Sequence, residues 1–328
     1  MKVNGELSDS FSIESGLKQG CPLSTLLFNL VLEWIMRQTV PNATPIKIGE
    51  ATYDRLAYAD DVDLCGENLD DLRPTYSTFK SAAKRPGLEI NQTKTKIMKA
   101  CRAGELTGTI NIEDDELECQ NDFKYLGSTV TSDDIIEEEI KIRIASGSRC
   151  SWALNSLLVS RSLSRKTKLQ TYTAIIRPIV LYGCETWRLT KELERRVNVF
   201  KHGILRKIYG PVWDQDEGRW RRRHNAELRQ LSQLPQISNI IKAHRLRWAG
   251  HVARLDNNKL AKRVMLGTPE GTRPLGRPRK RWSDNLKEDL LALGMEDPSQ
   301  WMEAAMDRPE WRKLVKAARD LHGPRPME

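Results

Sequence analysis

The sequence predicts an α+β fold in which small antiparallel hairpins and helices are followed by an almost entirely helical, basic region. Alternating apolar and polar residues flank short turn segments in the first 132 residues, and helical spacing dominates from residue 134 onward. The chain has 328 residues, of which 39% are hydrophobic. At roughly 150 residues per domain, this length allows about two domains with buried cores.

The first part of the chain predicts two hairpins with a helix between them. Alternating runs at residues 2–13 and 54–65 predict the hairpins. Pro22 predicts the start of the helix, which ends near Val40. Its apolar residues recur at helical spacing and predict one buried face, made of Leu23, Leu26, Leu27, Leu30, Val31, Trp34 and Ile35.

A second helix and three short strands are predicted next. The helix is indicated by the spacing of Leu69, Leu72, Tyr76, Phe79 and Ala83. Because proline disfavours a helix interior, Pro74 leaves the first residue of this helix undecided, and Gly87 is expected to terminate the helix. Short apolar runs predict strands at residues 88–91, 96–98 and 123–127.

From residue 134 the apolar residues follow helical spacing almost throughout. They predict buried helix faces through Ile136, Ile140 and Ile144, and later through Leu193, Val197, Phe200, Ile204 and Ile208. Residues 267–278 are rich in Pro, Gly and Arg, which predicts an extended connector before a last helical unit.

Several function classes are not expected from this sequence. The longest apolar run, residues 174–184, contains Arg177 and Pro178 and is shorter than the ~18 residues of a membrane span, so no membrane association is expected. The first residues lack the apolar stretch of a secretory signal, which predicts an intracellular protein of the nucleus or cytoplasm without disulfides. No C-x-x-C pair occurs, and the five histidines lack Cys or carboxylate neighbours at ligand spacing, so no zinc site is expected.

Charge is distributed unevenly along the chain. Residues 1–140 contain 14 Lys and Arg against 25 Asp and Glu, whereas residues 141–328 contain 39 against 19, so the net charges are −11 and +20 and together give the overall +9. Eight of the nine tryptophans also lie after residue 140. Cations concentrate polyanions and tryptophan offers a stacking surface for bases, so this half predicts nucleic-acid binding. The alternative is a solvated helix surface with tryptophans in the core.

Two cationic stretches, residues 219–224 and 273–282, are the candidate nucleic-acid-binding segments. Their candidate residues are Arg221, Arg222, Arg223, Arg277, Arg279 and Lys280. The second stretch contains Gly276-Arg277-Pro278, which resembles the core of an AT-hook that reads a narrow minor groove. Generic phosphate binding is the other interpretation, and it predicts affinity that falls steeply with salt.

Asp60 and Asp61 are the candidate metal ligands. Nucleotidyl transfer commonly uses two divalent cations about 3.5–4 Å apart, and Mg²⁺ or Mn²⁺ prefers carboxylate oxygens. The pair has strand-like apolar flanks, which predict a functional site in a cleft. Three other acid pairs are expected to be solvated turns or helix caps, namely Asp70-Asp71, Asp114-Asp115 and Asp133-Asp134.

Four sequence blocks around this pair resemble, in the same order, motifs of reverse transcriptases. Tyr58-Ala59-Asp60-Asp61 resembles the Y-A-D-D catalytic hairpin, and residues 16–29 resemble the Gln-Gly block that precedes it. Residues 87–95 resemble the following G-L…N…K-T block, and residues 123–128 resemble the F-x-Y-L-G primer grip. Together with residues 245–252 and 276–282, the residues of these four blocks are similar to those of non-LTR (LINE-type) retrotransposon polymerases of animals.

The resemblance implies an RNA-directed DNA polymerase, a nucleotidyltransferase that uses Mg²⁺ (or Mn²⁺), an RNA template and a DNA primer. It implies that Asp60 ligates the catalytic metal with help from Asp61, and that Tyr58 lies near the primer end. The other implied roles are nucleotide binding by Gln19 and Gly20, an approach of Lys94 to the triphosphate, and primer binding by Tyr125, Leu126 and Gly127. The implied architecture is a partial right-hand palm over residues 1–132, an all-α thumb-like region over 133–210 and a basic helical region over 211–328.

One part of the family's catalytic site has no match in this sequence. The family bridges both metals with a third carboxylate upstream of the Gln-Gly block, and Glu6, Asp9 and Glu14 lack its apolar context. With two carboxylates the reacting hydroxyl is poorly positioned. We therefore expect a retrotransposon reverse transcriptase fragment with impaired or no activity alone. The alternative is a non-catalytic nucleic-acid-binding remnant that uses its basic C-terminal region.

Overall fold

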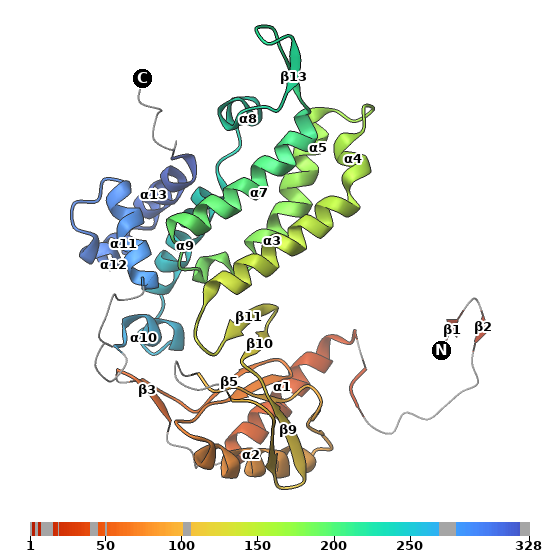
Figure 1. Cartoon of the computed structure of the whole chain (residues 1–328). Coiled ribbons are helices and arrows are strands. Elements are labelled where there is room, and N and C mark those ends of the chain that lie inside the picture. The colour runs from red at the N-terminus through yellow and green to blue at the C-terminus, as the bar shows by residue number, and fades with distance from the viewer. Residues whose placement is uncertain are drawn as a thin grey trace. The chain divides into compact units, whose positions relative to one another are not determined.

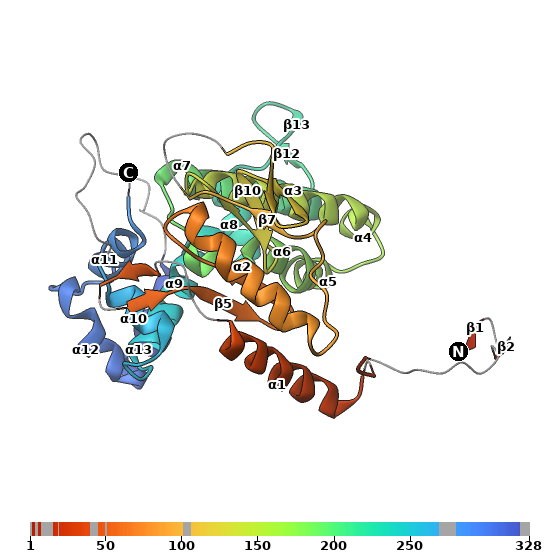
Figure 2. The ribbon, with the colours of Figure 1, turned by 90° about the horizontal axis from the view of Figure 1, so that it is seen from below.

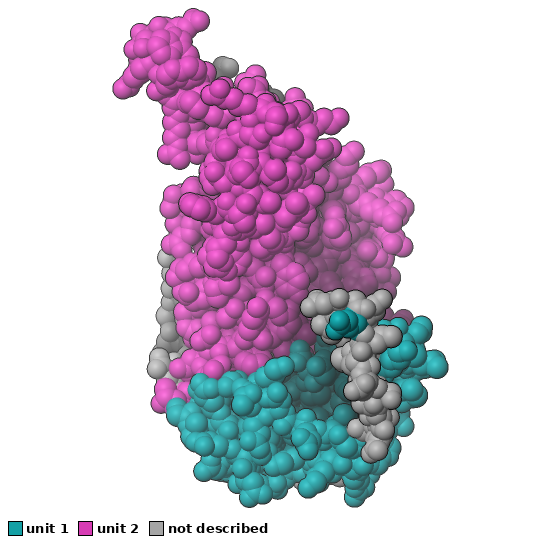
Figure 3. Space-filling model, turned by 90° about the vertical axis from the view of Figure 1, so that its right-hand side faces the viewer, with its two compact units in different colours: residues 1–97, 108–119 teal, residues 98–107, 120–328 magenta. Residues whose placement is uncertain are grey.

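The computed structural model of the chain describes residues 2–3, 6–7, 16–18, 20–39, 45–49, 51–100, 106–268 and 280–321. The chain forms two compact units (Figure 3). Unit 1 comprises Met1–Ile97 and Gly108–Cys119, and unit 2 comprises Met98–Thr107 and Gln120–Glu328. Helices and mostly antiparallel strands are both present, as an α+β prediction requires.

Unit 1 is built from small sheets and two long helices (Figure 1). Its elements in order are β1 (Lys2–Val3), β2 (Glu6–Leu7), α1 (Pro22–Gln38), β3 (Ile46–Ile48), β4 (Ala51–Tyr53), β5 (Arg55–Tyr58), β6 (Asp61–Leu64), α2 (Leu69–Lys84), β7 (Lys96–Ile97), β8 (Thr109–Ile112) and β9 (Asp115–Cys119). The pairs β1–β2, β3–β4 and β5–β6 are antiparallel hairpins. A fourth sheet has three strands in the order β7–β9–β8, in which β7 and β9 run parallel. The hairpin predicted at residues 54–65 is thus confirmed. The N-terminal prediction, in which residues 2–6 form one strand and residues 10–13 its partner, is wrong in its register, because Lys2–Val3 pairs with Glu6–Leu7. Residues 10–13 lie outside the described residues.

Helix α1 forms where predicted, but most of its apolar face is exposed. Leu23, Leu26, Leu27 and Leu30 are exposed by 46–61%, and of the predicted face only Ile35 is fully buried. Ile35 packs with α2, which lies beside α1 (Figure 2). The prediction of a buried face is therefore wrong for the N-terminal half of α1. Helical spacing determines which side chains share a face, but it does not determine what covers that face.

Helix α2 begins at Leu69, upstream of the internal Pro74. The side chain of Asn68 caps it by accepting a hydrogen bond from the backbone amide of Asp71. Gly87 follows the helix with a φ of +83°, a left-handed conformation that glycine adopts easily. The predicted strand at residues 88–91 does not form, because Asn91 accepts the amides of Lys94 and Thr95 and so closes a turn.

Unit 2 is mainly helical. It contains a hairpin, β10 (Asp122–Tyr125) and β11 (Ser128–Thr131), followed by α3 (Ile136–Ala153), α4 (Asn155–Val159), α5 (Arg165–Thr171), the π-helical turn η1 (Tyr172–Ile176), α6 (Arg177–Leu181), the 3₁₀ turn η2 (Cys184–Thr186) and α7 (Lys191–Tyr209). A second hairpin, β12 (Val212–Asp214) and β13 (Arg219–Arg221), precedes α8 (Asn225–Ser232), α9 (Ile237–Ala253), α10 (Leu260–Leu266), α11 (Trp282–Ala292), the 3₁₀ turn η3 (Pro298–Gln300), α12 (Trp301–Met306) and α13 (Arg308–Asp320). The hairpin β12–β13 projects beyond the end of α7 and was not predicted from the sequence (Figure 1).

The predicted helix faces of unit 2 are confirmed. Ile140 on α3 and Leu193, Val197, Ile204 and Ile208 on α7 are at most 5% exposed. They belong to two apolar clusters, to which the partly buried Ile136, Ile144 and Phe200 also pack. Burying each such side chain contributes about 1.5–3 kcal/mol, so these two clusters are a major source of stability.

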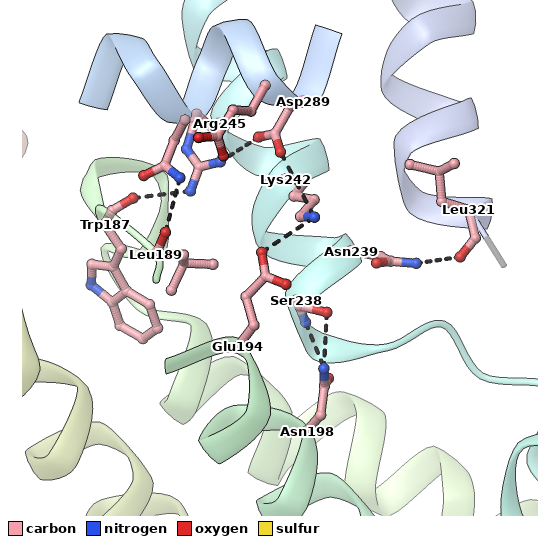
Figure 4. A network of polar contacts seen from close by, with 12 residues as sticks. Trp187, Leu189, Glu194, Asn198, Ser238, Asn239, Lys242, Arg245, Asp289 and Leu321 are labelled. Atoms are coloured by element: carbon pink, nitrogen blue, oxygen red, sulfur yellow. Dashed lines mark hydrogen bonds and ion pairs between the residues drawn. The ribbon is translucent and has the colours of Figure 1, made fainter. Parts of the chain in front are cut away.

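A network of buried polar contacts joins α9 to its neighbours (Figure 4). The guanidinium of Arg245 is fully buried, forms an ion pair with Asp289 of α11 and donates to the backbone oxygen of Trp187 at 3.0 Å. Lys242, one turn earlier, lies 3.2 Å from the carboxylate of Glu194 on α7. Because Asp289 is buried, its pKa is raised despite these cations.

Among the described segments, no helix has both the length and the apolar character of a membrane span.

Candidate functional site

The two adjacent aspartates lie at the tip of the hairpin β5–β6. Tyr58 pairs with Asp61 across the hairpin, and Ala59 and Asp60 form the two-residue turn between them. Directly opposed residues point to the same face of a hairpin, so the phenol of Tyr58 and the carboxylate of Asp61 share one face. Ala59 has a φ of +53°, which a residue with a Cβ adopts only at a cost. The turn is therefore held in a strained conformation next to both acids.

Arg55 anchors this hairpin to helix α1. Its guanidinium donates to the backbone oxygens of Met36, at 2.5 Å, and Thr39, at 3.1 Å, where α1 ends and carbonyl groups lack helical partners. It also forms an ion pair of 2.8 Å with Asp54. The backbone oxygen of Asp54 accepts the amide of Cys65 at 2.7 Å and closes the base of the hairpin. Arg55 therefore fixes the position of the acidic tip relative to α1.

Both carboxylates of the tip are available to an external ligand. Asp60 and Asp61 are exposed, and neither carboxylate makes a hydrogen bond or an ion pair with any residue that the structure describes. The expectation that apolar flanks enclose them is wrong, because Leu56 is 37% and Tyr58 65% exposed. Two unpaired carboxylates on adjacent residues are hard oxygen donors, which fit Mg²⁺ or Mn²⁺. Of the three upstream acids, only Glu6 is described, and it is exposed.

Two further predicted residues belong to unit 1. Lys94 lies in the turn after α2, where its backbone amide donates to the backbone oxygen and the side-chain oxygen of Asn91, each at 3.1 Å. Its side chain is exposed and has no partner in the described part of the chain. Gly20 precedes α1 with a φ of +86°, and a Cβ there would meet no atom within 4 Å. Gln19 lies outside the described residues.

Asp115, which the sequence analysis assigned to a solvated pair, is a buried structural residue. Its carboxylate is 1% exposed and accepts a hydrogen bond of 2.7 Å from the hydroxyl of Tyr76 and one from the amide of Gln92. The ammonium of Lys80 lies 2.7 Å from it. Burial alone would raise the pKa of this carboxyl, but hydrogen bonds from Lys80 and Tyr76 outweigh it, and the pKa is lowered. The assignment was wrong because the partners come from α2 and the turn after it, far away in sequence.

The other two acid pairs are placed as expected. Asp71 lies in the first turn of α2, where its amide is bound by the cap residue Asn68. The carboxylate of Asp133 accepts the amide of Ile135 just before α3, and Asp134 forms an ion pair with Arg188. These acids stabilise helix starts.

In unit 2, the predicted primer-binding residues form the turn between β10 and β11. Tyr125 pairs with Ser128, and Leu126 and Gly127 between them have positive φ values of 46° and 84°. The hydroxyl of Tyr182 donates to the backbone oxygen of Leu126 at 2.6 Å.

Helix α3 also holds this turn. Arg143 donates to the backbone oxygen of Gly127, and its guanidinium lies 4.6 Å from the centre of the Tyr182 ring. Arg143 also forms an ion pair of 2.6 Å with the buried Glu139, whose other oxygen accepts the amide of Thr129 at 2.8 Å. Contacts from α3 and from Tyr182, the residue after α6, thus hold this turn.

The cationic residues predicted to bind nucleic acid differ in whether their side chains already have partners within the described structure. Arg221 forms ion pairs with Glu227 at 2.7 Å and Asp214 at 2.6 Å, and these two carboxylates raise its pKa. Arg223 donates to the backbone oxygen of Gly210 at 3.2 Å, and Lys280 lies 2.5 Å from Glu288. Arg222 is exposed and makes no hydrogen bond or ion pair to any described residue. Arg277 and Arg279 lie outside the described residues.

One histidine has neighbours that sequence spacing did not reveal. The thiol of Cys184 and Nδ1 of His244 are 3.5 Å apart, and with a carboxylate oxygen of Glu185 they lie within 4.8 Å of one another. Burial raises the pKa of the Cys184 thiol to about 12, so the thiol is neutral. Burial, and then Arg247, lowers the pKa of His244. The contact joins η2 to α9 within the fold.

Comparison with known proteins finds similarity to reverse transcriptases and to a transposon-derived protein. Residues 1–130 match the family described as reverse transcriptase (RNA-dependent DNA polymerase). A transposon-derived protein of Caenorhabditis elegans is 25% identical over 284 residues, which cover 83% of this chain and 98% of that protein.

Two retrotransposon polyproteins are also similar. The Pol polyprotein of the type-2 retrotransposable element R2DM of Drosophila melanogaster is 35% identical over 91 residues, or 28% of this chain and 8% of the polyprotein. That of the type-1 element R2 of Nasonia vitripennis is 29% identical over 137 residues, or 39% of this chain and 13% of the polyprotein. The chain therefore spans only a small part of both polyproteins.

Proposed function

Because residues 1–130 are a reverse transcriptase domain with relatives in non-LTR retrotransposons, we propose that this chain carries the active-site hairpin of an RNA-directed DNA polymerase. The observation that supports this most directly is the tip of β5–β6, which offers two adjacent carboxylates with no partner in the described structure. In this proposal residues 1–132 are a partial palm, residues 133–210 a thumb-like region and residues 211–328 a basic nucleic-acid-binding region.

The roles of the hairpin residues follow from their chemistry. Asp60 and Asp61 hold a divalent cation, Mg²⁺ or Mn²⁺. Such a cation activates a primer hydroxyl and neutralises phosphate charge when bound. Tyr58 presents an exposed ring on the same face as Asp61 and contacts the primer end. The strained turn at Ala59 keeps both acids at the tip, so little reorganisation precedes binding.

The remaining proposed roles belong to Lys94, to the Gln-Gly block and to the turn between β10 and β11. Lys94 stabilises the charge of the departing pyrophosphate, because its ammonium has no competing carboxylate in the described structure. The open space at Gly20 lets an incoming nucleotide approach the backbone, and Gln19, which lies outside the described residues, is the second proposed nucleotide-binding residue. Tyr125, Leu126 and Gly127 contact the primer strand, and the hydrogen bonds from Arg143 and Tyr182 to the backbone of their turn suit that role.

Primer extension on an RNA template tests the proposal. The comparison is between the full chain, Asp60→Ala and the control Asp70→Ala, which removes an exposed acid from α2. We expect any extension by the full chain to be lost in Asp60→Ala and kept in the control. Extension that persists in Asp60→Ala contradicts the assignment of the site.

A second readout does not depend on activity. Titration with Mn²⁺, followed by electron paramagnetic resonance, measures how many ions the chain binds. We expect Asp60→Asn together with Asp61→Asn to remove a bound ion that Asp70→Asn leaves in place. Equal Mn²⁺ binding by all variants contradicts metal ligation at this tip.

A second candidate function is nucleic-acid binding without catalysis. The net charge of +20 on residues 141–328 favours it, because such a field attracts phosphate backbones. It predicts that the full chain binds oligonucleotides without extending a primer, with Lys280, Arg222 and neighbouring cations contributing. Affinity that does not change between about 50 mM and 200 mM salt contradicts it.

A further inference from the structure

An open groove runs between helices α3 and α7, which lie side by side within unit 2 (Figure 1). Its volume is about 520 Å³, within the range of small-molecule sites. Phe200, Gly203 and Ile204 of α7 and Trp152 of α3 line it. A Cβ at Gly203 would meet no atom within 4 Å, so this part of the wall is open. We call this feature the α3–α7 groove.

Trp152 exposes a large flat surface at this groove. Its side chain is 79% exposed, more than any other large hydrophobic residue in the described structure. Its indole makes no ring contact with any described residue, whereas the rings of Trp213 and Trp220 meet edge to face with their centres 5.6 Å apart, and the ring centre of Trp301 lies 6.4 Å from that of Trp311. An exposed indole with a free face is a stacking surface for an aromatic ligand.

Three cations line the same groove without a carboxylate partner. The side chains of Lys207 and Arg222 make no hydrogen bond or ion pair to any residue in the described ranges. Arg206 donates to the backbone oxygen of Arg223 at 3.2 Å and to the side-chain oxygen of Asn225 at 2.6 Å, both of which are neutral. Burial, and then the nearby charge of Arg222, lowers the pKa of Arg206. The positive charge at the groove is therefore uncompensated.

The ligand that fits is an anion that also carries a flat aromatic ring. Neighbouring positive charges attract phosphates, and a free indole face attracts a base. A duplex keeps its bases stacked inside and cannot present one to Trp152 without unpairing. We propose that the α3–α7 groove binds single-stranded nucleic acid, with a base stacked on Trp152 and phosphates beside Lys207 and Arg222. This inference shares the substrate class of the proposed function, but it does not depend on catalysis.

The test is a binding titration with the full chain in the absence of divalent metal. A fluorescein-labelled oligothymidylate is the probe, its fluorescence anisotropy is the readout, and unlabelled heparin serves as a polyanion without bases. We expect Trp152→Ala to weaken oligothymidylate binding about five- to hundredfold, the range measured for loss of one stacked base, and to leave heparin binding unchanged. Trp152→Phe keeps an aromatic face and is expected to restore most of the affinity.

The charged residues are tested by salt dependence. Lys207→Ala and Arg222→Ala are each expected to reduce the slope of log affinity against log salt by about one, because each removes one phosphate contact. Two matched controls leave the groove intact. Ile142→Ala removes an exposed apolar residue from the same helix, and Lys316→Ala removes an exposed cation from α13.

The outcomes separate this inference from the proposed function. Unchanged oligothymidylate binding in Trp152→Ala, or an equal loss of heparin binding, overturns base stacking at the groove. Tighter binding of the corresponding duplex also overturns it. None of these results involves Asp60 or metal. A chain that fails to extend a primer can therefore still show binding at the α3–α7 groove, and a chain that extends a primer can still fail to bind there.

Discussion

Replacing Asp115 is expected to loosen the part of unit 1 that carries Lys94. The carboxylate of Asp115 is the common acceptor of Tyr76 and Lys80 on α2 and of Gln92 in the following turn. Asp115→Ala therefore removes the polar contacts that tie α2 and this turn to β9. Lys94 lies two residues after Gln92, so its position depends on the same contacts.

The expected loss of folding free energy in Asp115→Ala can be worked out from the surroundings of each hydrogen-bond partner. Leaving the buried hydroxyl of Tyr76 without an acceptor costs about 1–3 kcal/mol, and the hydrogen bond from Gln92 contributes about 1 kcal/mol. The side chain of Lys80 is 32% exposed and regains water, so loss of its ion pair adds little to the destabilisation. Because the two hydrogen-bond losses act on one unit, Asp115→Ala should destabilise unit 1 by about 2–4 kcal/mol.

Hydrogen exchange read peptide by peptide is the appropriate assay, because eight of the nine tryptophans lie outside unit 1 and would dominate a fluorescence signal. At 1.4 kcal/mol per factor of ten, a loss of 3 kcal/mol speeds exchange in α2 and β9 by about a hundredfold. The matched control is Asp114→Ala, an exposed neighbour whose loss should change stability by less than about 0.5 kcal/mol. If exchange in Asp115→Ala stays within about threefold of the unmodified chain, the carboxylate does not hold this region together.

The same residue makes a prediction about acid stability. The pKa of the Asp115 carboxyl is lower in the fold than its ordinary value of 3.8, so its contribution is complete above that pH and is lost as the pH falls through the folded value. Protection of α2 should therefore decline in acid more steeply in the unmodified chain than in Asp115→Asn. Parallel declines would contradict the lowered pKa.

Three further changes test features of the fold. Ala59→Gly should stabilise the hairpin by about 0.5–1 kcal/mol, because glycine adopts a positive φ without strain. Slower hydrogen exchange at the hairpin tip would show this stabilisation, and faster exchange would contradict strain at Ala59. Arg55→Lys should destabilise the hairpin β5–β6 by about 1–2 kcal/mol, because lysine cannot make both guanidinium contacts with α1. Unchanged hydrogen exchange in α1 and in β5–β6 would refute this. Gly250→Ala should destabilise unit 2 by about 1–3 kcal/mol, because the new Cβ overlaps the indole of Trp311, and an unchanged urea midpoint would refute this.

Features that depend on neighbours in sequence were predictable. The register of β5–β6 follows from alternation around a two-residue turn, and α2 follows from its helical spacing and the cap at Asn68. The Tyr58-Ala59-Asp60-Asp61 motif located the hairpin tip for the same reason. Local patterns specify local conformation, so these elements could be predicted without knowing what packs against them.

Features that depend on distant partners were not predictable. Nothing local distinguishes Asp115 from Asp114, since only the approach of α2 gives Asp115 its three donors. The contact between Cys184 and His244 spans 60 residues, so no ligand spacing could indicate it. Exposure of the leucines on α1 was missed because an amphipathic pattern carries no information about what covers it.

The buried guanidinium of Arg245 has a consequence for how the chain can be shortened. Its counter-charge, Asp289, is supplied by a helix that begins after residue 280, while its other acceptor, the carbonyl of Trp187, precedes α7. A protein expressed only to residue 268 would lose this anion together with α11, α12 and α13, which pack against α9. It would also expose the apolar face of α9 that these helices bury, formed by Ala243, Leu246, Ala249 and Ala253. The last helices are therefore an integral component of the core rather than a detachable tail.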